Sequence, residues 1–212
     1  MILKLIPWIL QTIAWIPTRI IYALTARFRV RGRKNLTATT NEKGVIFAAN
    51  HISTHDPIAV RAALPLFSAP LYFVSLESRE YRHLPLLRYI SGGLFFRLWG
   101  AYPVFRGLGD YSKALAYHIK ILSKGRLLCM FPHGGINDKS PRPGIGFLAA
   151  QSGATIVPTH LSRASGHFEV TFGKPFTFRS LGLIDDGTQE TYRAASERIM
   201  EKIYELADDS LR

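Results

Sequence analysis

The stretch ANHISTHDPIAV, at positions 49–60, holds the residue types for acid/base chemistry. His51 precedes Asp56 by five residues, and a carboxylate bound to one imidazole nitrogen fixes the tautomer and stabilises the imidazolium. The other nitrogen would then be free to take a proton from a substrate hydroxyl. A structural role competes with this hypothesis. Asp before Pro57 is a common helix start, in which the carboxylate only caps the helix.

Other catalytic chemistry finds less support. Cys129 is the single cysteine and lies in the apolar run RLLCMF, so we interpret it as a buried, inert thiol. The seven histidines show no metal-ligand spacing, and we expect no metal site. The sequence has no Gly-x-Ser-x-Gly nucleophile motif. His55 falls inside the His51–Asp56 spacing, and we expect it to have a supporting or exposed role.

Alternating strand-like and helix-like stretches must position these residues. The strand-like runs are GVIFAAN, LYFVSL, AYPVF, RLLCMF and ATIVPTHL, and the helix-like stretches are 57–66, 83–98, 111–124 and 145–151. This alternation predicts an α/β fold with a largely parallel central sheet flanked by helices. HFEVTFGKPF predicts an antiparallel strand at one side, and residues 189–207 predict an amphipathic terminal helix.

The predicted sheet gives His51 a functional location. Ligands of α/β sheets gather at the carboxyl ends of the strands, and GVIFAAN brings His51 to that edge. Asp110 and Gly125 are expected to begin and end the helix at 111–124. Backbone N–H groups near the turn after His51 are candidates to hold a developing oxyanion.

Composition fits one compact domain with an N-terminal extension. The 212 residues are 47% hydrophobic, enough for a core, and the formal charge is +12. Residues 1–41 contain no acid. They contain seven bases, namely Lys4, Arg19, Arg27, Arg29, Arg31, Arg33 and Lys34. We therefore divide the chain into a membrane-anchoring segment, 1–43, and a catalytic α/β domain, 44–212.

The N-terminal run LIPWILQTIAWIPT is uncharged over 14 residues. It is shorter than the roughly 20 residues that a spanning helix needs, and it contains Pro7, Gln11 and Pro17. Apolar side chains next to basic residues are typical of a helical segment that lies on an anionic membrane surface. A cleaved signal peptide, a helix packed on the protein's own core and a nucleic-acid arm at RFRVRGRKN are alternatives. Peripheral or monotopic attachment is favoured, with no nucleic-acid partner expected.

Four motifs in order carry a resemblance to a known family. They are NHISTHDP, GAYPVFRG, FPHGG and IVPTHL, all between residues 50 and 160. Their order resembles the glycerolipid acyltransferases, the group of the bacterial 1-acylglycerol-3-phosphate acyltransferases. The resemblance implies transfer of a fatty acyl group from acyl-CoA or acyl carrier protein to a lysophospholipid hydroxyl in phospholipid biosynthesis. It also implies no cofactor beyond that acyl donor, and an active site on the cytoplasmic side of the membrane.

The resemblance also implies roles for single residues. His51 would be the general base and Asp56 its orienting partner, and Arg106 would bind phosphate with a close backbone approach at Gly107. The turn-shaping residues would be Phe131, Pro132 and Gly134, with Pro158 marking the fourth motif. Plain core packing is the alternative for Pro158, and a solvated arginine is the alternative for Arg106.

The third motif departs from the family pattern. His133 stands where the family has a glutamate, and Ile136 stands where an arginine often follows. Lys139 and Arg142 are candidates to replace the missing positive charge and, with His133, to bind substrate. The expected acceptor is 1-acylglycerol-3-phosphate. A non-phosphorylated lipid acceptor, an inactive membrane-binding relative and a hydrolase that releases free fatty acid are the alternatives.

Overall fold

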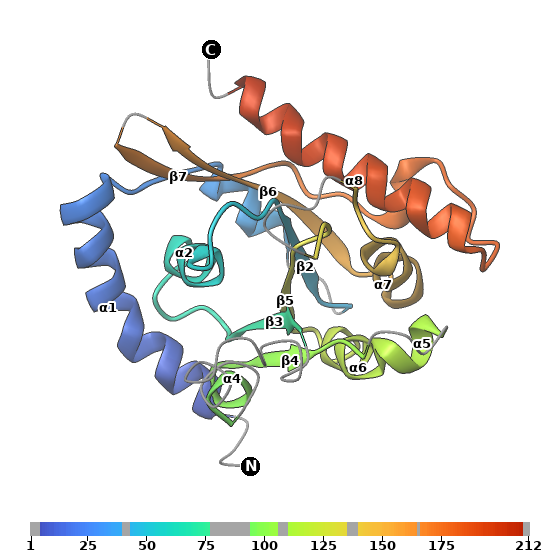
Figure 1. Ribbon diagram of the computed structural model, residues 1–212, viewed down its shortest axis with the longest axis horizontal. Helices are drawn as coiled ribbons and strands as arrows, with labels where there is room; N and C mark the ends of the chain where they lie inside the picture. Colours follow the sequence, from blue (N-terminus) through green and yellow to red (C-terminus); the bar gives the residue numbers. More distant parts are fainter. Residues whose placement is uncertain are drawn as a thin grey trace.

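The computed structural model describes residues 5–39, 43–76, 94–105, 110–134, 140–164 and 166–209. Among these residues, seven strands form one sheet in the order β1-β7-β6-β2-β5-β3-β4 (Figure 1). The strands are β1 (Arg29–Arg31), β2 (Val45–Ala49), β3 (Leu71–Ser75), β4 (Ala101–Pro103), β5 (Leu127–Met130), β6 (Thr155–Ala164) and β7 (His167–Phe172). The predicted α/β class is confirmed.

Strand direction divides the sheet into two parts. β6, β2, β5, β3 and β4 are parallel neighbours, so their carboxyl ends meet at one edge. β7 pairs antiparallel with β6, as the period-two pattern predicts. β1 pairs parallel with β7 and forms the edge on that side. This three-residue strand was not predicted from the sequence, and it places part of the N-terminal segment inside the sheet.

Helices cover both faces of the sheet (Figure 1). On one face lie α5 (Tyr111–Ala114), α6 (Ala116–Leu122), α7 (Gly144–Ser152), the 3-10 helix η4 (Phe178–Leu181) and α8 (Gln189–Asp209). On the other lie α1 (Ile6–Ala26), α2 (Asp56–Ala63) and α4 (Leu94–Trp99). The 3-10 helix η2 (Arg33–Thr39) follows β1. The sheet is therefore the middle layer, as expected for a parallel sheet that must be buried on both faces.

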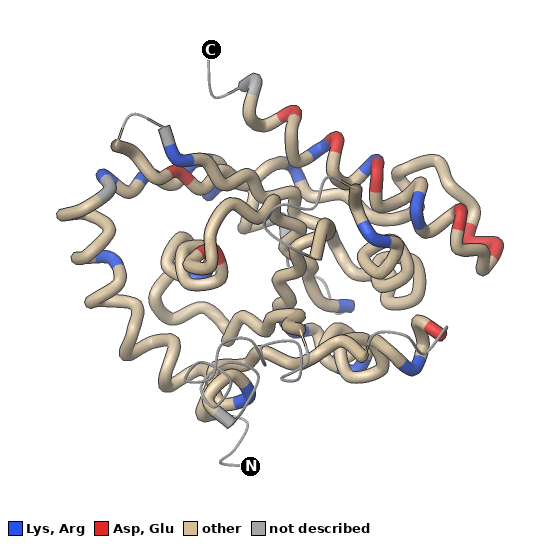
Figure 2. Tube along the Cα trace, in the orientation of Figure 1, with Lys and Arg blue, Asp and Glu red and all other residues tan. Residues whose placement is uncertain are grey.

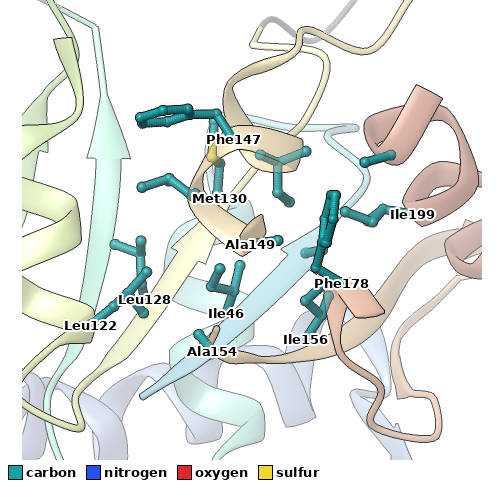
Figure 3. Close-up of a cluster of buried hydrophobic side chains, with 14 of the residues drawn as sticks. Ile46, Leu122, Leu128, Met130, Phe147, Ala149, Ala154, Ile156, Phe178 and Ile199 are labelled. Carbon is teal, nitrogen blue, oxygen red and sulfur yellow. The ribbon is translucent and has the colours of Figure 1, made fainter. Parts of the chain in front are cut away.

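The first core joins the sheet to α7 and α8. Alternate strand residues such as Ile46, Leu128 and Ile156 point to this side and are fully buried. Figure 3 shows them together with Phe147 of α7 and Ile199 of α8. Because side chains alternate along a strand, the intervening residues must face the other layer. The sequence pattern of continuous apolar runs follows from this burial on both sides.

The second core lies under α2. Val45, Phe47 and Cys129 of the sheet pack there with Ala59 and Val60 of α2. α1 covers the outer side of α2, so this short helix is enclosed between the sheet and α1 (Figure 1). This arrangement explains why most of the buried residues of α2 are small and apolar, namely Ala59, Val60, Ala62 and Ala63. Cys129 is completely buried, in agreement with an inert core thiol.

Two predicted helices differ in detail. The stretch 111–124 forms two short helices that meet at Leu115, which is buried in the first core. Asp110 caps its start by accepting from the backbone N–H groups of Ser112 and Lys113, as predicted. Of the predicted helix 83–98, residues 83–93 lie outside the described residues, and residues 94–98 belong to α4.

α1 is a single helix of 21 residues that continues through Pro17. Pro7 lies in the first turn, where its missing N–H costs no helical hydrogen bond. In the described part of the chain, no helix has the length and apolar character required to cross a bilayer. The inner face of α1 packs on the protein, as one of the alternatives anticipated, while its outer face remains exposed.

Candidate active site

The loop that carries His51 is attached to the sheet by Asn50. The Asn50 side chain accepts from the N–H of Leu161 at 2.7 Å and donates to the carbonyl of Leu161 at 2.8 Å. Asn50 therefore continues the pairing of β2 with β6 by one further residue, with its side chain in place of a backbone. Since Asn50 is 5% exposed, this pairing lies in the protein interior. It fixes the position from which His51 leaves the sheet.

His51 and Asp56 are hydrogen bonded. The distance from His51 Nδ1 to Asp56 Oδ2 is 2.7 Å. An ionised carboxylate can only accept, so Nδ1 carries the proton and Nε2 holds the free lone pair. Among the described residues, none forms a hydrogen bond with Nε2. The His51 side chain keeps 17% exposure, whereas that of Asp56 is fully buried. This is the arrangement of a base with an orienting carboxylate.

The same carboxylate oxygen also closes the loop. Asp56 Oδ2 accepts from the N–H groups of Ile52 and Ser53 at 2.6 and 2.8 Å. Asp56 is the first residue of α2, yet its bonds run back to the residues before the helix. The helix-cap interpretation is therefore wrong. Because the backbone N–H groups of Ile52 and Ser53 already donate to Asp56, these two groups cannot hold an oxyanion.

Phe131 of the third motif packs on His51. Its ring lies against the imidazole of His51, with ring centroids 4.2 Å apart and planes inclined by 20°. Phe131 follows β5, the strand next to β2, so neighbouring strands deliver both rings. Gly134 completes the turn at φ 73°, a value that favours glycine, and its N–H donates to Phe131 O at 3.0 Å. The first and third motifs thus meet through Phe131.

His133 points towards the other layer. Its ring neighbours Tyr204 of α8, at 6.4 Å between centroids, and it is 7% exposed. A hollow of about 730 Å³ between this turn and α8 is lined by His133, Pro141 and three glutamates of α8. Arg142 is joined to the same turn, because its N–H donates to Pro132 O and its Nε donates to His133 O. The structure brings His133 and Arg142 together, but on the α8 side of the sheet.

The structure describes only some of the remaining residues that the sequence analysis named. Arg106, Gly107 and Lys139, with Ile136, lie outside the described residues. Pro158 is buried within β6 beside Ala48, and its carbonyl accepts from Gly173 N at 2.8 Å. His55 is exposed, and its Nδ1 lies 3.2 Å from Ser53 Oγ.

Two further residues near the pair were not singled out by sequence reasoning. Asn50 directly precedes His51, and an amide at the end of a strand was the available signal. Tyr22 of α1 stacks on Phe28 and Phe168, at 4.9 and 5.6 Å between centroids. Its pKa is raised, first by burial and then by the negative charge of Asp56. α1 therefore reaches the side of the domain on which the His51–Asp56 pair lies.

A mostly parallel sheet with an oriented imidazole at its carboxyl edge, and with the four motifs in this order, is the architecture expected of the glycerolipid acyltransferases. The model of the family described as Acyltransferase matches residues 27–162, more than half of the chain, and the chain belongs to this family. The resemblance drawn from the motifs is confirmed.

A solved structure shares the fold. The crystal structure of the 1-acyl-sn-glycerophosphate (LPA) acyltransferase, PlsC, from Thermotoga maritima is similar with a TM-score of 0.52. The similarity covers 84% of this chain and 72% of that chain, at 18% sequence identity.

Proposed function

We propose that the protein transfers a fatty acyl group from a thioester, acyl-CoA or acyl carrier protein, to the hydroxyl of a lysophospholipid. His51 acts as the general base and Asp56 holds it in position. The observation that carries the proposal is the 2.7 Å bond between His51 Nδ1 and the fully buried Asp56 carboxylate. That bond leaves Nε2 as the basic nitrogen at the edge of the sheet where substrates of such folds collect.

The chemistry needs no covalent intermediate on the enzyme. His51 Nε2 removes the proton from the acceptor hydroxyl as its oxygen attacks the thioester carbonyl. The tetrahedral intermediate then collapses, the carbon–sulfur bond breaks, and the thiolate leaves. The imidazolium returns its proton to that sulfur, so the enzyme ends in its starting state. Asp56 stabilises the imidazolium in between, through the Nδ1–H bond.

Phe131 contributes to this step through orientation. The imidazole can rotate about its side-chain torsions, and only one orientation bonds with Asp56. The stacked ring of Phe131 restricts that rotation from one side, and the Asn50–Leu161 pairing fixes the backbone. Base and carboxylate are therefore held in place before the substrate binds, which lowers the entropic cost of reaching the transition state.

1-Acylglycerol-3-phosphate is the acceptor that we propose first. The motif order and the shared fold support it, because the similar Thermotoga maritima protein is a 1-acyl-sn-glycerophosphate acyltransferase. His133 replaces the usual glutamate of the third motif, and other lysophospholipids and non-phosphorylated lipids belong in the same test. Arg106, Lys139 and Arg142 are the proposed sources of positive charge for a phosphate.

Membrane attachment through α1 belongs to the proposal. The outer face of α1, together with the preceding Leu5, exposes aliphatic side chains at helical spacing, namely Leu5, Ile9, Ile13, Ile16, Ile20 and Leu24. We call these six residues the apolar stripe. It is about 28 Å long at 1.5 Å per residue, and Figure 2 shows that α1 carries hardly any charge along it. Such a face is typical of a helix that lies in the membrane interface.

Basic residues follow the stripe directly. Arg27, Arg29, Arg33 and Lys34 are exposed after the end of α1. Arg31 is also exposed, and its Nε lies 2.9 Å from Glu169 Oε2. Arg19, the single charged residue inside α1, is turned inwards between the rings of Trp15 and Phe28. The pattern supports burial of the stripe among acyl chains with the arginines at anionic headgroups, on the cytoplasmic side of the membrane.

The experiment that tests the function supplies both donors to the purified protein. Labelled acyl-CoA and labelled acyl carrier protein are each incubated with 1-acylglycerol-3-phosphate, other lysophospholipids and a neutral or aminoacyl lysolipid. Labelled diacyl lipid, made only when an acceptor is present, is the expected product. Free fatty acid in place of lipid product would indicate a hydrolase, and no turnover with any pair would indicate an inactive membrane-binding relative.

A further inference from the structure

The Gln11 side chain of α1 uses every hydrogen-bonding position of its amide. Its Nε2 donates to the carbonyls of Leu71 and Trp99 at 2.7 and 2.8 Å. Its Oε1 accepts from the N–H of Leu71 at 2.9 Å and from Nε of Arg61 at 3.1 Å. An amide has two donors and two acceptor sites, so these bonds saturate it. Gln11 is completely buried, and one side chain therefore joins α1 to β3, to α4 and to α2.

Arg61, the partner on α2, is a buried cation, and no carboxylate of the described residues pairs with it. It is 2% exposed, and burial lowers its pKa to about 10. Its guanidinium donates to Gln11 Oε1 and to the carbonyls of Pro65 and Leu66. Burying a charge among neutral acceptors costs free energy that an apolar side chain of similar size would avoid. What the pair adds over an apolar contact is a defined geometry between two helices.

Little space separates the two helices at this point. A void of only about 10 Å³ remains between them, lined by Gln11, Trp15 and Arg61 among others. Trp15, one turn further along α1, donates from Nε1 to the carbonyl of Leu64 at 3.0 Å. Leu64 directly follows α2, so Gln11 and Trp15 both bind the carboxyl end of this helix. α1 is therefore held in one rotation and one register on α2.

The two ends of the connection are the membrane face and the catalytic pair. Gln11 points inwards between Ile9 and Ile13, which belong to the apolar stripe and are 43% and 67% exposed. Arg61 lies on the helix that begins with Asp56, the residue bonded to His51. The rotation of α1 decides which face meets the bilayer, and α2 carries the orienting carboxylate. The Gln11–Arg61 contact is a polar bond that joins these two helices directly.

We infer that Gln11 and Arg61 are positioning residues that hold the His51–Asp56 pair at a fixed height and orientation relative to the membrane surface. This inference rests on the proposed function and on attachment through the apolar stripe. An acceptor embedded in a bilayer presents its hydroxyl at a depth set by its acyl chain. A base held rigidly relative to the bilayer meets that hydroxyl productively, whereas a base on a loosely docked domain does so in only a fraction of orientations. A monomeric acceptor in solution places no such demand.

The kinetic test compares two acceptors. Turnover of a vesicle-embedded acceptor, per enzyme molecule bound to vesicles, is divided by turnover of a short-chain monomeric acceptor. We expect Gln11→Met and Arg61→Met each to lower this ratio by about fivefold or more, the size of effect expected from loss of a buried hydrogen bond. The double variant should lower it no further than the larger single effect, because both residues act through one contact.

Ser196→Ala is the matched control. Ser196 Oγ accepts from Gly146 N at 3.1 Å and is buried between α7 and α8, so its loss removes a helix–helix polar bond far from α1. This variant should lose stability without a change in the ratio. If the ratio also stays at its wild-type value in Gln11→Met and Arg61→Met, the positioning role is wrong.

A second measurement does not depend on activity or on the acceptor. A spin label at His55→Cys reports the distance from the active-site loop to labelled lipid headgroups, since native Cys129 is fully buried. The wild-type background should give a narrow distance distribution, and Gln11→Met should broaden it at equal vesicle binding. Equal widths would overturn the inference. Absent transfer activity in the wild type would overturn the proposed function, and the distance measurement would still decide whether Gln11 fixes the active-site loop relative to the membrane. Absent vesicle binding would overturn both the attachment and this inference.

Discussion

The ring of Phe131 stacks on the imidazole of His51, with 4.2 Å between the ring centroids. The two residues are 80 positions apart in the chain and belong to different motifs. The contact gives the apolar residue of the third motif a physical task, which is to hold the plane of the His51 imidazole.

Phe131→Leu tests this task. Leucine keeps most of the apolar volume but removes the flat surface, and aromatic pairs contribute roughly 0.5–1.5 kcal/mol beyond their buried area. We expect the turnover number to fall by about threefold to tenfold, with acceptor KM unchanged. Steady-state kinetics would check this, and Phe131→Tyr, which keeps the stacked ring, should retain the wild-type turnover number. Equal turnover in Phe131→Leu would show that Asp56 alone orients the imidazole.

Asp56→Asn separates orientation from charge. The asparagine oxygen can still accept from Ile52 and Ser53, so the loop should keep its course, but the negative charge beside the imidazolium is lost. We expect a roughly tenfold to 100-fold loss of turnover, smaller than for His51→Ala. Stability should fall by about 1–3 kcal/mol, since the new amide donor has no partner at the buried Oδ1 position. Full activity per folded molecule would assign Asp56 a structural role alone.

The apolar stripe predicts the strength of membrane attachment. Ile13→Asp with Ile20→Asp places two charges where apolar side chains would enter the bilayer. The exposed fractions of these two residues are 67% and 54%. Vesicle binding in cosedimentation should fall by about 100-fold or more, because each lost isoleucine removes roughly 1.5–3 kcal/mol of burial. Ile184→Asp is the control, since Ile184 is 86% exposed but not on α1. If the control and the double variant bind vesicles equally, α1 is not the attachment site.

His118 predicts an acid-sensitive stability. It is fully buried on α6, its Nε2 is 3.1 Å from Tyr102 O, and burial lowers its pKa to about 4 from an ordinary 6.5. Between these two pKa values the unfolded chain binds a proton at His118 that the folded chain does not. The contribution of His118 to the free energy of unfolding is therefore fully present above about pH 6.5 and is lost progressively as the pH falls towards 4. The slope should be about 1.4 kcal/mol per pH unit.

The corresponding variant is His118→Gln, which keeps a donor for Tyr102 but cannot be protonated in this range. Urea unfolding at several pH values should show a flatter dependence for this variant. The same substitution at exposed His55 should leave the wild-type slope intact. A His118→Gln protein with an unaltered slope would show that other groups cause the acid sensitivity.

Much of the fold could be predicted because local patterns determine it. Strands buried on both faces give continuous apolar runs, and the cap at Asp110 gives a recognisable helix start. β1 could not be predicted, since its three residues, RVR, are not buried and are ordered by pairing with β7. The spacing of His51 and Asp56 left both a hydrogen-bonded pair and a helix cap open, and the bonds of the Asp56 carboxylate to His51, Ile52 and Ser53 decide for the pair.

Long-range partners explain what the sequence concealed. Gln11 interrupts an apolar run, and only its pairing with Leu71, 60 residues away, shows why a polar residue is needed there. Asn50 likewise bonds with Leu161 across 111 residues. The inner face of α1 packs on the protein and its outer face carries the apolar stripe. Packing on the protein's own core, which was an alternative to membrane attachment in the sequence, therefore takes one side of the helix and leaves the apolar stripe for the proposed attachment.

The proposed mechanism requires His51 Nε2 to remove the proton from the acceptor hydroxyl. The most direct measurement is the turnover of purified His51→Ala with labelled thioester and the best acceptor, in protein whose unfolding transition matches the wild type. We expect a loss of about 10²–10⁴-fold, the usual contribution of a general base. Turnover near the wild-type value in folded His51→Ala protein would contradict it.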